Sequence, residues 1–164
     1  MPVSTSEFRK ALGQFATGVT VVTVMRENGR VHGMTANSFT SVSLEPLQIL
    51  VCVDRLALTH KFLHERRVFG VNILGEDQEA VARYFARPEQ EPESGSRLGV
   101  AFHSSPRGTP LLSGTLVQLD CGLVRAVEAG DHSIFIGEVA EMHVREGRPL
   151  LFHGGQFKKI GSDD

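Results

Sequence analysis

Residues 33–41 (GMTANSFTS) are the part of the sequence whose side chains best suit recognition of a ligand. Threonine, asparagine and serine offer hydrogen-bond donors and acceptors close to the backbone, with little bulk. Such a surface suits a flat heteroaromatic ring whose edge alternates donors and acceptors. A polar turn between two strands is the alternative interpretation of the same residues.

Several common catalytic motifs are absent from the sequence. It contains no glycine-rich dinucleotide or phosphate loop, no H-E-x-x-H zinc motif and no G-x-S-x-G nucleophile motif. His60 and His64 could share one helix face, but no third ligand lies near them in sequence, so no metal site is predicted. Cys52 and Cys121 each lie in an apolar stretch and are expected to be buried thiols in a reducing compartment.

Length and charge exclude several classes of protein. A chain of 164 residues is expected to form one domain, residues 1–164, with 161–164 as a frayed polar tail. Its 17 Lys and Arg against 19 Asp and Glu are not the strongly basic balance of a generic nucleic-acid binder. No apolar run approaches the roughly 20 residues that span a bilayer, and no signal peptide is recognisable, so we expect a cytoplasmic protein without a membrane partner.

The first expected element is a helix that begins with a capping box. Ser4 and Glu7 have the S-x-x-E spacing in which each side chain accepts a hydrogen bond from the other residue's backbone N–H. Gly18 is expected to end this helix. Its apolar stripe consists of Phe8, Leu12 and Phe15.

Most of the remaining chain has the pattern of β-strands. Short helices are expected at 59–65, capped by Thr59, and at 76–85, and a mobile surface loop at 87–99. β-Branched and apolar runs predict strands at 19–25, 31–37, 47–53, 68–74, 114–127, 133–144, 150–153 and 156–160. The order predicts a mainly β fold with a few helices, arranged as a closed or nearly closed antiparallel barrel.

Several segments, in order and over nearly the whole chain, resemble the short-chain flavin reductase family. They are GVTVVT (18–23), GMTANS (33–38), SVSLEP (41–46), FGVNIL (69–74) with Asp77-Gln78, Phe85-Ala86, GDH (130–132), IGEV (136–139) and PLLF (149–152) ahead of Gly155. No one segment is decisive, but together they are specific.

The resemblance implies an antiparallel split β-barrel of the FMN-binding type, usually a homodimer. It implies an NAD(P)H-dependent flavin reductase, in which hydride passes from nicotinamide C4 to N5 of FMN or FAD, with NADH or NADPH as donor. Many members supply reduced flavin to a separate monooxygenase. A non-catalytic FMN-binding carrier is an alternative. An oxidase of the pyridoxamine-phosphate type would need basic residues converging on a substrate phosphate, and the sequence shows no such cluster.

The resemblance also implies which residues contact the flavin. The GMTANS segment would line the isoalloxazine ring through residues 35–38, and 52–54 would run alongside it. Residues 58–59 would approach the ribityl phosphate, and 85–86 would follow the helix that closes over the tail. Arg87 would be a charge partner for the phosphate. These flavin residues are Met34, Thr35, Ala36, Asn37, Ser38, Cys52, Val53, Asp54, Leu58, Thr59, Phe85, Ala86 and Arg87. The chain departs from the family at Ala57, where many members have a serine.

On the nicotinamide side, the resemblance implies three residues. His132 of the GDH segment would be the catalytic side chain, as an orienting donor or proton relay near neutral pH. Phe152 and His153 would belong to the region that receives the nicotinamide. The alternative for His132 is a turn histidine at the start of a strand.

Overall fold

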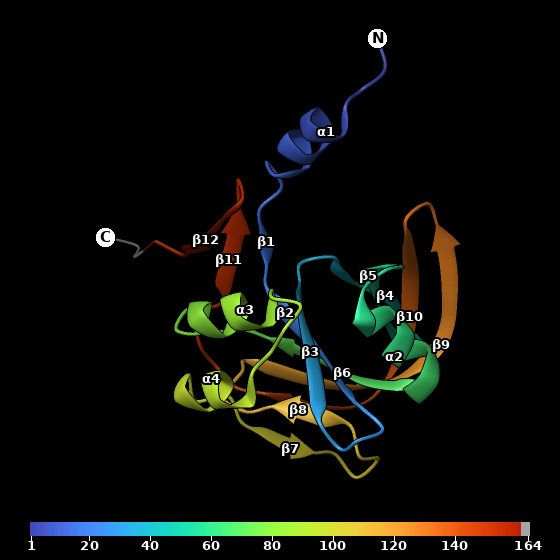
Figure 1. Ribbon diagram of the computed structural model, residues 1–164, viewed down its shortest axis with the longest axis vertical. Helices are drawn as coiled ribbons and strands as arrows, with labels where there is room; N and C mark the ends of the chain where they lie inside the picture. The colour runs from blue at the N-terminus through green and yellow to red at the C-terminus, as the bar shows by residue number, and fades with distance from the viewer. Residues whose placement is uncertain (162–164) are drawn as a thin grey trace.

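A computed structural model describes residues 1–161 of the chain (Figure 1); residues 162–164 of the expected frayed tail lie outside this range. The helices are α1 (Thr5–Leu12), α2 (Leu58–Arg66), α3 (Glu79–Phe85) and α4 (Pro92–Arg97). The strands are β1 (Thr17–Gly18), β2 (Thr20–Met25), β3 (Val31–Ala36), β4 (Phe39–Leu44), β5 (Leu47–Asp54), β6 (Val68–Ile73), β7 (Phe102–Ser104), β8 (Pro110–Leu112), β9 (Val117–Ala129), β10 (His132–Val144), β11 (Leu150–His153) and β12 (Gln156–Lys159).

The main sheet is antiparallel, with the strand order β3-β2-β6-β9-β10-β5-β4. Its two edge strands, β3 and β4, are consecutive in the chain and are joined only by Asn37 and Ser38. A link of two residues cannot cross an open sheet of this width, so the sheet must curl until its edges meet at this link. β3 and β4 are not paired with each other, and the ring of strands therefore stays open along one seam. The prediction of a mainly β, antiparallel split-barrel fold is confirmed.

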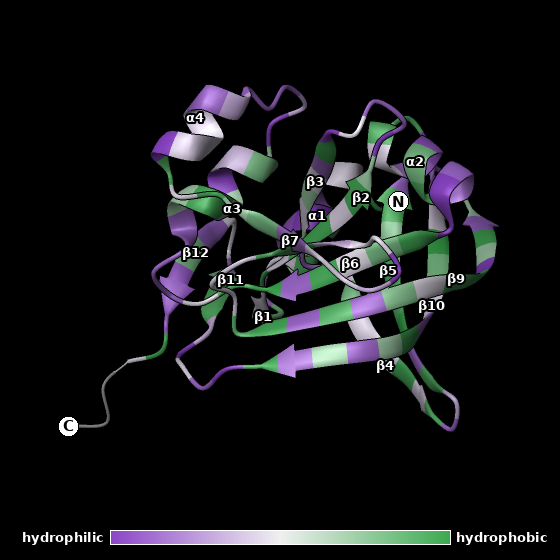
Figure 2. Ribbon diagram, turned by 90° about the horizontal axis from the view of Figure 1, so that it is seen from below, coloured by the Kyte–Doolittle hydropathy of each residue, from purple (hydrophilic) through white to green (hydrophobic). Residues whose placement is uncertain are grey.

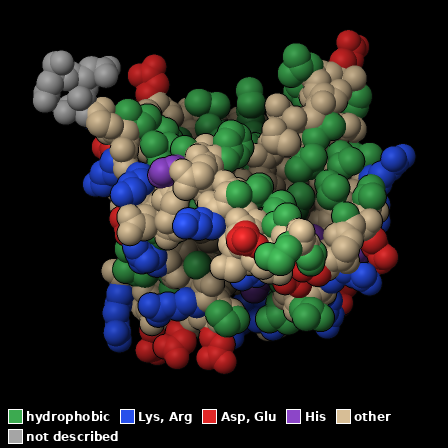
Figure 3. Space-filling model, turned by 90° about the horizontal axis from the view of Figure 1, so that it is seen from above, with side chains coloured by type: hydrophobic (Ala, Val, Ile, Leu, Met, Phe, Trp, Pro, Cys, Tyr) green, Lys and Arg blue, Asp and Glu red, His purple; other side chains and the backbone are tan. Residues whose placement is uncertain are grey.

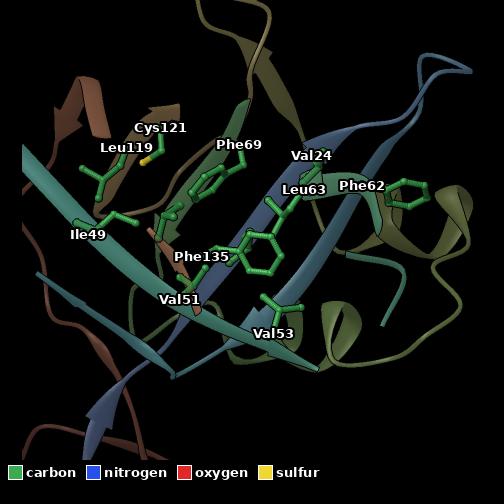
Figure 4. Packing of buried hydrophobic residues seen from close by; sticks show 12 residues of the cluster. Val24, Ile49, Val51, Val53, Phe62, Leu63, Phe69, Leu119, Cys121 and Phe135 are labelled. Carbon is green, nitrogen blue, oxygen red and sulfur yellow. The ribbon is translucent and has the colours of Figure 1, made fainter. Parts of the chain in front are cut away.

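The curled sheet encloses one apolar core, and α2 closes it from the side. Phe62 and Leu63 of α2 pack with Val51, Phe69 and Phe135 from three strands (Figure 4). Removal of these side chains from water is the main force that holds the curled sheet together.

A second core lies on the outer side of β2. Val21 points there, whereas its neighbour Val22 points into the barrel, so β2 is buried on both faces. Tyr84 and Phe85 of α3 cover this outer side together with Leu150 of β11. A strand buried on both faces explains why residues 19–25 consist of valine, threonine and methionine, without a charged residue at alternate positions.

The strands β9 and β10 form a long hairpin, along much of which hydrophobic and hydrophilic residues alternate (Figure 2). Gly130, at a φ of 62°, lies in the turn that connects them. This positive φ favours glycine because a Cβ atom would be strained there. The turn places His132 at the first position of β10.

The helices differ from the sequence prediction at their ends. The capping box of Ser4 and Glu7 is confirmed, but α1 ends at Leu12, because Gly13 caps it and Gly18 already belongs to β1. Thr59 does not cap α2: the helix begins one residue earlier, after Ala57, and the Thr59 hydroxyl is hydrogen-bonded elsewhere.

The prediction was also inaccurate around α3. This helix begins at Glu79 rather than at residue 76, because a Gly75–Gln78 turn precedes it, with the Gln78 side chain accepting from the Gly75 N–H. The expected mobile loop at 87–99 contains the short helix α4, whose Gly95 lies against the Tyr84 hydroxyl. Within residues 1–161, no helix is long and apolar enough to cross a membrane, and no three potential metal ligands gather.

A buried carboxylate fixes the loop between β7 and β8 to the barrel wall. Asp120 is fully buried and accepts hydrogen bonds from Arg107 Nε and Nη2 at 3.1 and 2.9 Å and from Thr109 Oγ1 at 2.7 Å. Burial by itself would raise the pKa of Asp120, but the hydrogen bonds from Arg107 and Thr109 outweigh it and hold the pKa below the ordinary value. Asp120 is therefore charged in the folded state at neutral pH.

Replacement of this carboxylate, Asp120→Asn, is expected to lower the free energy of unfolding at pH 7 by about 2 kcal/mol, because Arg107 would lose its only described ion pair. Because the folded-state pKa is lowered, the wild-type contribution is complete above about pH 4 and decreases as the pH falls further. The two proteins should therefore differ less at pH 3 than at pH 7 in urea denaturation. Asp77→Asn, at an exposed carboxylate, serves as control; equal stability of Asp120→Asn and wild type at pH 7 would contradict the assignment.

Candidate functional site

A cavity of about 210 Å³ lies at the seam, beside the link between β3 and β4. Asn37 and Phe39 contribute to it from the link and β4, and Thr17 contributes from β1. The Thr17 hydroxyl is buried without a hydrogen-bond partner, and the Asn37 side chain forms no hydrogen bond within residues 1–161. A buried hydroxyl without a partner costs free energy, so a ligand with polar groups on its edge would fit these two side chains.

Two other hydroxyls of the 33–41 segment, those of Thr35 and Ser38, stabilise the fold rather than face this cavity. Thr35 Oγ1 donates to the Ala82 carbonyl of α3 at 2.6 Å. Ser38 Oγ donates to the Cys52 carbonyl at 2.8 Å and thereby fastens the link between the edge strands to β5. Of the four predicted residues Thr35, Ala36, Asn37 and Ser38, only Asn37 therefore has side-chain polar groups available to a ligand.

The predicted β5 residues point to two different faces of the sheet. Val53 is buried in the barrel core, so it could meet a ligand only through its backbone. Cys52 and Asp54 alternate with it and lie on the outer face, opposite Ile134 and His132 of β10. Burial raises the pKa of the Cys52 thiol and raises that of Cys121 to about 12, so neither thiol is a thiolate at neutral pH.

A second cavity, of about 220 Å³, gathers six of the predicted flavin residues from three parts of the chain. They are Met34 of β3, Leu58 and Thr59 of α2, and Phe85, Ala86 and Arg87 at the end of α3. The Arg87 guanidinium has no ion pair within residues 1–161, so it is available to an anionic group. This cavity combines an apolar wall with one cation, which suits a flexible chain that ends in a phosphate.

Three hydrogen bonds fix the walls of this second cavity. His32 Nε2 and Thr59 Oγ1 lie 2.9 Å apart and are both buried, so the Thr59 hydroxyl is already engaged. Burial, and then the charge of Arg26, lowers the pKa of His32, which is therefore neutral at pH 7. Gln90 binds both backbone groups of Gly33: its Oε1 accepts from the Gly33 N–H at 3.2 Å and its Nε2 donates to the Gly33 carbonyl at 2.5 Å. Gln90 thus pairs with the free edge of β3 and holds the loop after α3 beside it.

His132 lies at the end of β10, paired in register with Asp54 of β5. Its ring is about half exposed, and Nδ1 lies 2.8 Å from Asp131 Oδ1. An ionised carboxylate can only accept, so Nδ1 carries the proton and Nε2 is the nitrogen left for a ligand. The same hydrogen bond holds the pKa of Asp131 below its ordinary value. The Asp131 carbonyl also accepts from the Arg55 N–H, which joins this turn to the segment that leads into α2.

Phe152 and His153 lie in a different sheet, which consists of β1, β11 and β12. Phe152 is paired with Thr17 of β1 and packs edge-on against Phe157, with 5.4 Å between ring centres. Phe152 is thus next to the seam cavity through Thr17, whereas His132 is next to Asp54 on β5. The linings of the seam cavity and of the second cavity include neither His132 nor this pair.

The sequence did not point to Thr17, His32 or Gln90 as candidate site residues. Thr17 is one polar residue in a short strand, and Gln90 lies in a segment whose prolines and glutamates indicate a loop. His32 and Gln90 matter through hydrogen bonds to residues 27 and 57 positions away, and Thr17 through a cavity that it shares with Asn37, so a local pattern could not have revealed them. The only indication of a role for Gln90 is that β3 is an edge strand, whose unpaired backbone groups require hydrogen-bond partners.

Comparison with known proteins identifies the family of the chain over almost its whole length. The family model of the flavin reductase like domain matches residues 12–161. An NADH-dependent flavin reductase of a Rhodococcus species is 41% identical over 160 residues, which cover 96% of this chain and 88% of that protein. The reductase subunit HsaB of a flavin-dependent monooxygenase from Rhodococcus jostii is 36% identical and covers 95% of this chain and 78% of that protein.

A solved structure supports both the fold and the family. The NADH:FAD oxidoreductase SgcE6 of Streptomyces globisporus, in complex with NAD and FAD fragments, superimposes with a TM-score of 0.86 at 39% identity, covering 96% of this chain and 93% of that one. A TM-score of this size over 96% of the chain shows that the two proteins share the overall fold. The chain therefore belongs to the family of the flavin reductase like domain.

Proposed function

We propose that this chain is an oxidoreductase that reduces FMN or FAD with a nicotinamide donor, NADH by analogy with its named relatives. The observation that carries the proposal is the 41% identity to an NADH-dependent flavin reductase across 96% of the chain. A non-catalytic FMN carrier is not favoured, because the named relatives are reductases. We further propose that residues 1–164 act as one domain in the cytoplasm, where Cys52 and Cys121 would stay reduced.

The seam cavity fits the edge of the flavin ring, and the second cavity fits its tail. When bound, the flavin supplies a ring that accepts a hydride at N5 from C4 of the nicotinamide. Asn37 and the unpartnered Thr17 hydroxyl would hydrogen-bond the ring edge, and Arg87 would hold the phosphate. Met34, Phe85 and Ala86 would exclude water from the tail. Ser38 and Thr35 would act indirectly, because their hydroxyls fix the walls of the site.

His132 would orient the nicotinamide or hold a proton at Nε2. Asp131 accepts the Nδ1–H, so the imidazole ring cannot flip freely and exchange the positions of its two nitrogens. The half-exposed position leaves space for a donor that binds, reacts and leaves. Phe152 and His153 would form another part of the nicotinamide region, next to Thr17.

A homodimer would explain the surroundings of α1. None of its residues is buried, and its Phe8 and Leu12 are exposed to 58% and 56%. Phe15, three residues after the helix, is exposed to 75%. In Figure 1 this helix projects from the body of the molecule, and Figure 3 shows apolar side chains gathered on the face seen from the same side. A helix of eight residues is not stable by itself in water, so its apolar side requires a partner surface.

A monooxygenase component is the partner that we propose for the reduced product. Relatives of this chain are reductase components of flavin-dependent monooxygenases. The half-exposed position of His132 agrees with a flavin that exchanges with solvent rather than one locked in the barrel.

The purified protein should accelerate reduction of added FMN or FAD by NADH under anaerobic conditions. Loss of the flavin absorbance band near 450 nm, roughly the position for flavins in general, reports the reaction. The rate should depend linearly on the concentration of protein. Flavin that binds but stays oxidised when both NADH and NADPH are present would support the carrier instead.

The variant His132→Ala should lower kcat/KM for NADH by about 10- to 100-fold, because it removes the side chain that would orient the nicotinamide or hold a proton at Nε2. The dissociation constant of FMN should change by less than a factor of two or three. His143→Ala, an exposed histidine further along β10, is the matched control. An unchanged rate of NADH oxidation in His132→Ala would show that the assigned role is wrong.

Size-exclusion chromatography with light scattering should give a mass of twice 17.9 kDa for the wild-type protein. The double variant Phe8→Ser, Phe15→Ser should shift the equilibrium toward the monomer, because it removes two exposed aromatic side chains, one on α1 and one just after it. Leu98→Ser, at an exposed leucine after α4, should leave the mass unchanged. A monomeric wild type at micromolar concentration would disprove the homodimer.

A further inference from the structure

A third cavity, of about 300 Å³, continues from the second cavity, which contains the residues predicted to contact the tail of the flavin. The two share His32, Leu58, Pro88 and Gln90, so they form one groove along the free edge of β3. The order along this edge is Asn37 just after β3, Met34 within it and Arg30 just before it. A ligand with its ring at the seam and its phosphate near Arg87 would point its far end into this third cavity.

The far end of the groove presents two arginines. Arg26 and Arg30 come from the two sides of the β2–β3 hairpin and both line the third cavity. Neither forms an ion pair within residues 1–161. The Arg26 guanidinium lies over the Phe62 ring, 5.3 Å from its centre, which holds the charge in one orientation before any ligand binds. Free guanidinium groups in a concave site are typical of phosphate recognition.

The opposite wall carries carboxylates. Glu89 and Glu91 lie on the loop after α3, which Gln90 fastens to Gly33. Carboxylate oxygens accept from the hydroxyls of a ribose, as they do in dinucleotide sites. The combination of guanidinium and carboxylate groups suits a nucleoside phosphate better than a simple anion such as inorganic phosphate.

We infer that the end of the groove at Arg26 and Arg30 binds the adenosine monophosphate half of FAD, so that this chain prefers FAD to FMN. The inference rests on the proposed function, because the flavin ring and first phosphate must lie at the seam and at Arg87. FMN ends at the first phosphate and leaves Arg26 and Arg30 without a partner. Arg26 and Arg30 therefore contribute to the difference in affinity between FAD and FMN rather than to the affinity for both flavins.

Isothermal titration calorimetry with FMN and with FAD tests this directly. The wild type should bind FAD at least about tenfold more tightly than FMN, since charge-assisted hydrogen bonds to a second phosphate add to the affinity. Arg30→Ala and Arg26→Ala should each weaken FAD binding by about tenfold, with the FMN dissociation constant as internal reference. Arg26→Lys, which keeps the charge, should recover part of the loss. Arg66→Ala, at an exposed arginine at the end of α2 that lines none of these cavities, is the control.

The outcomes separate this inference from the proposed function. Equal weakening of FMN and FAD in the arginine variants, or no weakening of FAD, overturns the inference and leaves flavin reduction intact. A wild type that binds neither flavin overturns the proposed function itself.

NADH also carries an adenosine diphosphate, so its KM must be measured with FMN as acceptor. A KM for NADH that stays unchanged in the arginine variants supports FAD as the occupant. A raised KM for NADH with unchanged FAD affinity assigns the groove to the donor and overturns the inference.

Discussion

The two-residue link between β3 and β4 is the constraint on which the rest of the structure depends. These strands are the opposite edges of a seven-stranded sheet, so a link of Asn37 and Ser38 alone forces the sheet to curl into a barrel. The Ser38 hydroxyl then fastens the link to Cys52 of β5. Because β3 and β4 are not paired, the barrel keeps a seam with exposed backbone edges, and the cavities lie along this seam.

The seam needs support from outside the sheet, and side chains of neighbouring elements provide it. Gln90 covers the two backbone groups of Gly33 as a paired strand would, and the Thr35 hydroxyl donates to the Ala82 carbonyl of α3. His32 and Thr59 connect β3 to α2 inside the barrel. These contacts satisfy polar groups of an edge strand and, for the same reason, fix the shape of the groove beside it. The residues that satisfy this edge strand therefore also shape the groove that we propose as a ligand site.

The groups left without partners then indicate what the groove can bind. The Thr17 hydroxyl and the Asn37 amide line the seam cavity, and the Arg87 guanidinium lies in the second cavity. Arg26 and Arg30 lie at the far end. Polar groups of this kind at successive positions match a ligand with a polar ring edge and one or two phosphates. His132, held by Asp131 beside the end of β5, adds a half-exposed imidazole outside the barrel core.

The sequence by itself determined the capping box of α1, most of the strands, and the family, because each depends on residues that are near in the chain or on a pattern of segments in order. It also gave the six residues of the second cavity, through the resemblance. Only the tertiary structure decided which hydroxyls remain free: Thr35 and Ser38 look equivalent to Asn37 in the sequence, but their donors bind carbonyls of α3 and β5. Likewise Arg26 and Arg30 are ordinary scattered arginines in the sequence, whereas the resemblance already pointed to Arg87. They face one groove because the curled sheet brings the β2–β3 hairpin beside the end of α3, and no local pattern encodes such a long-range contact.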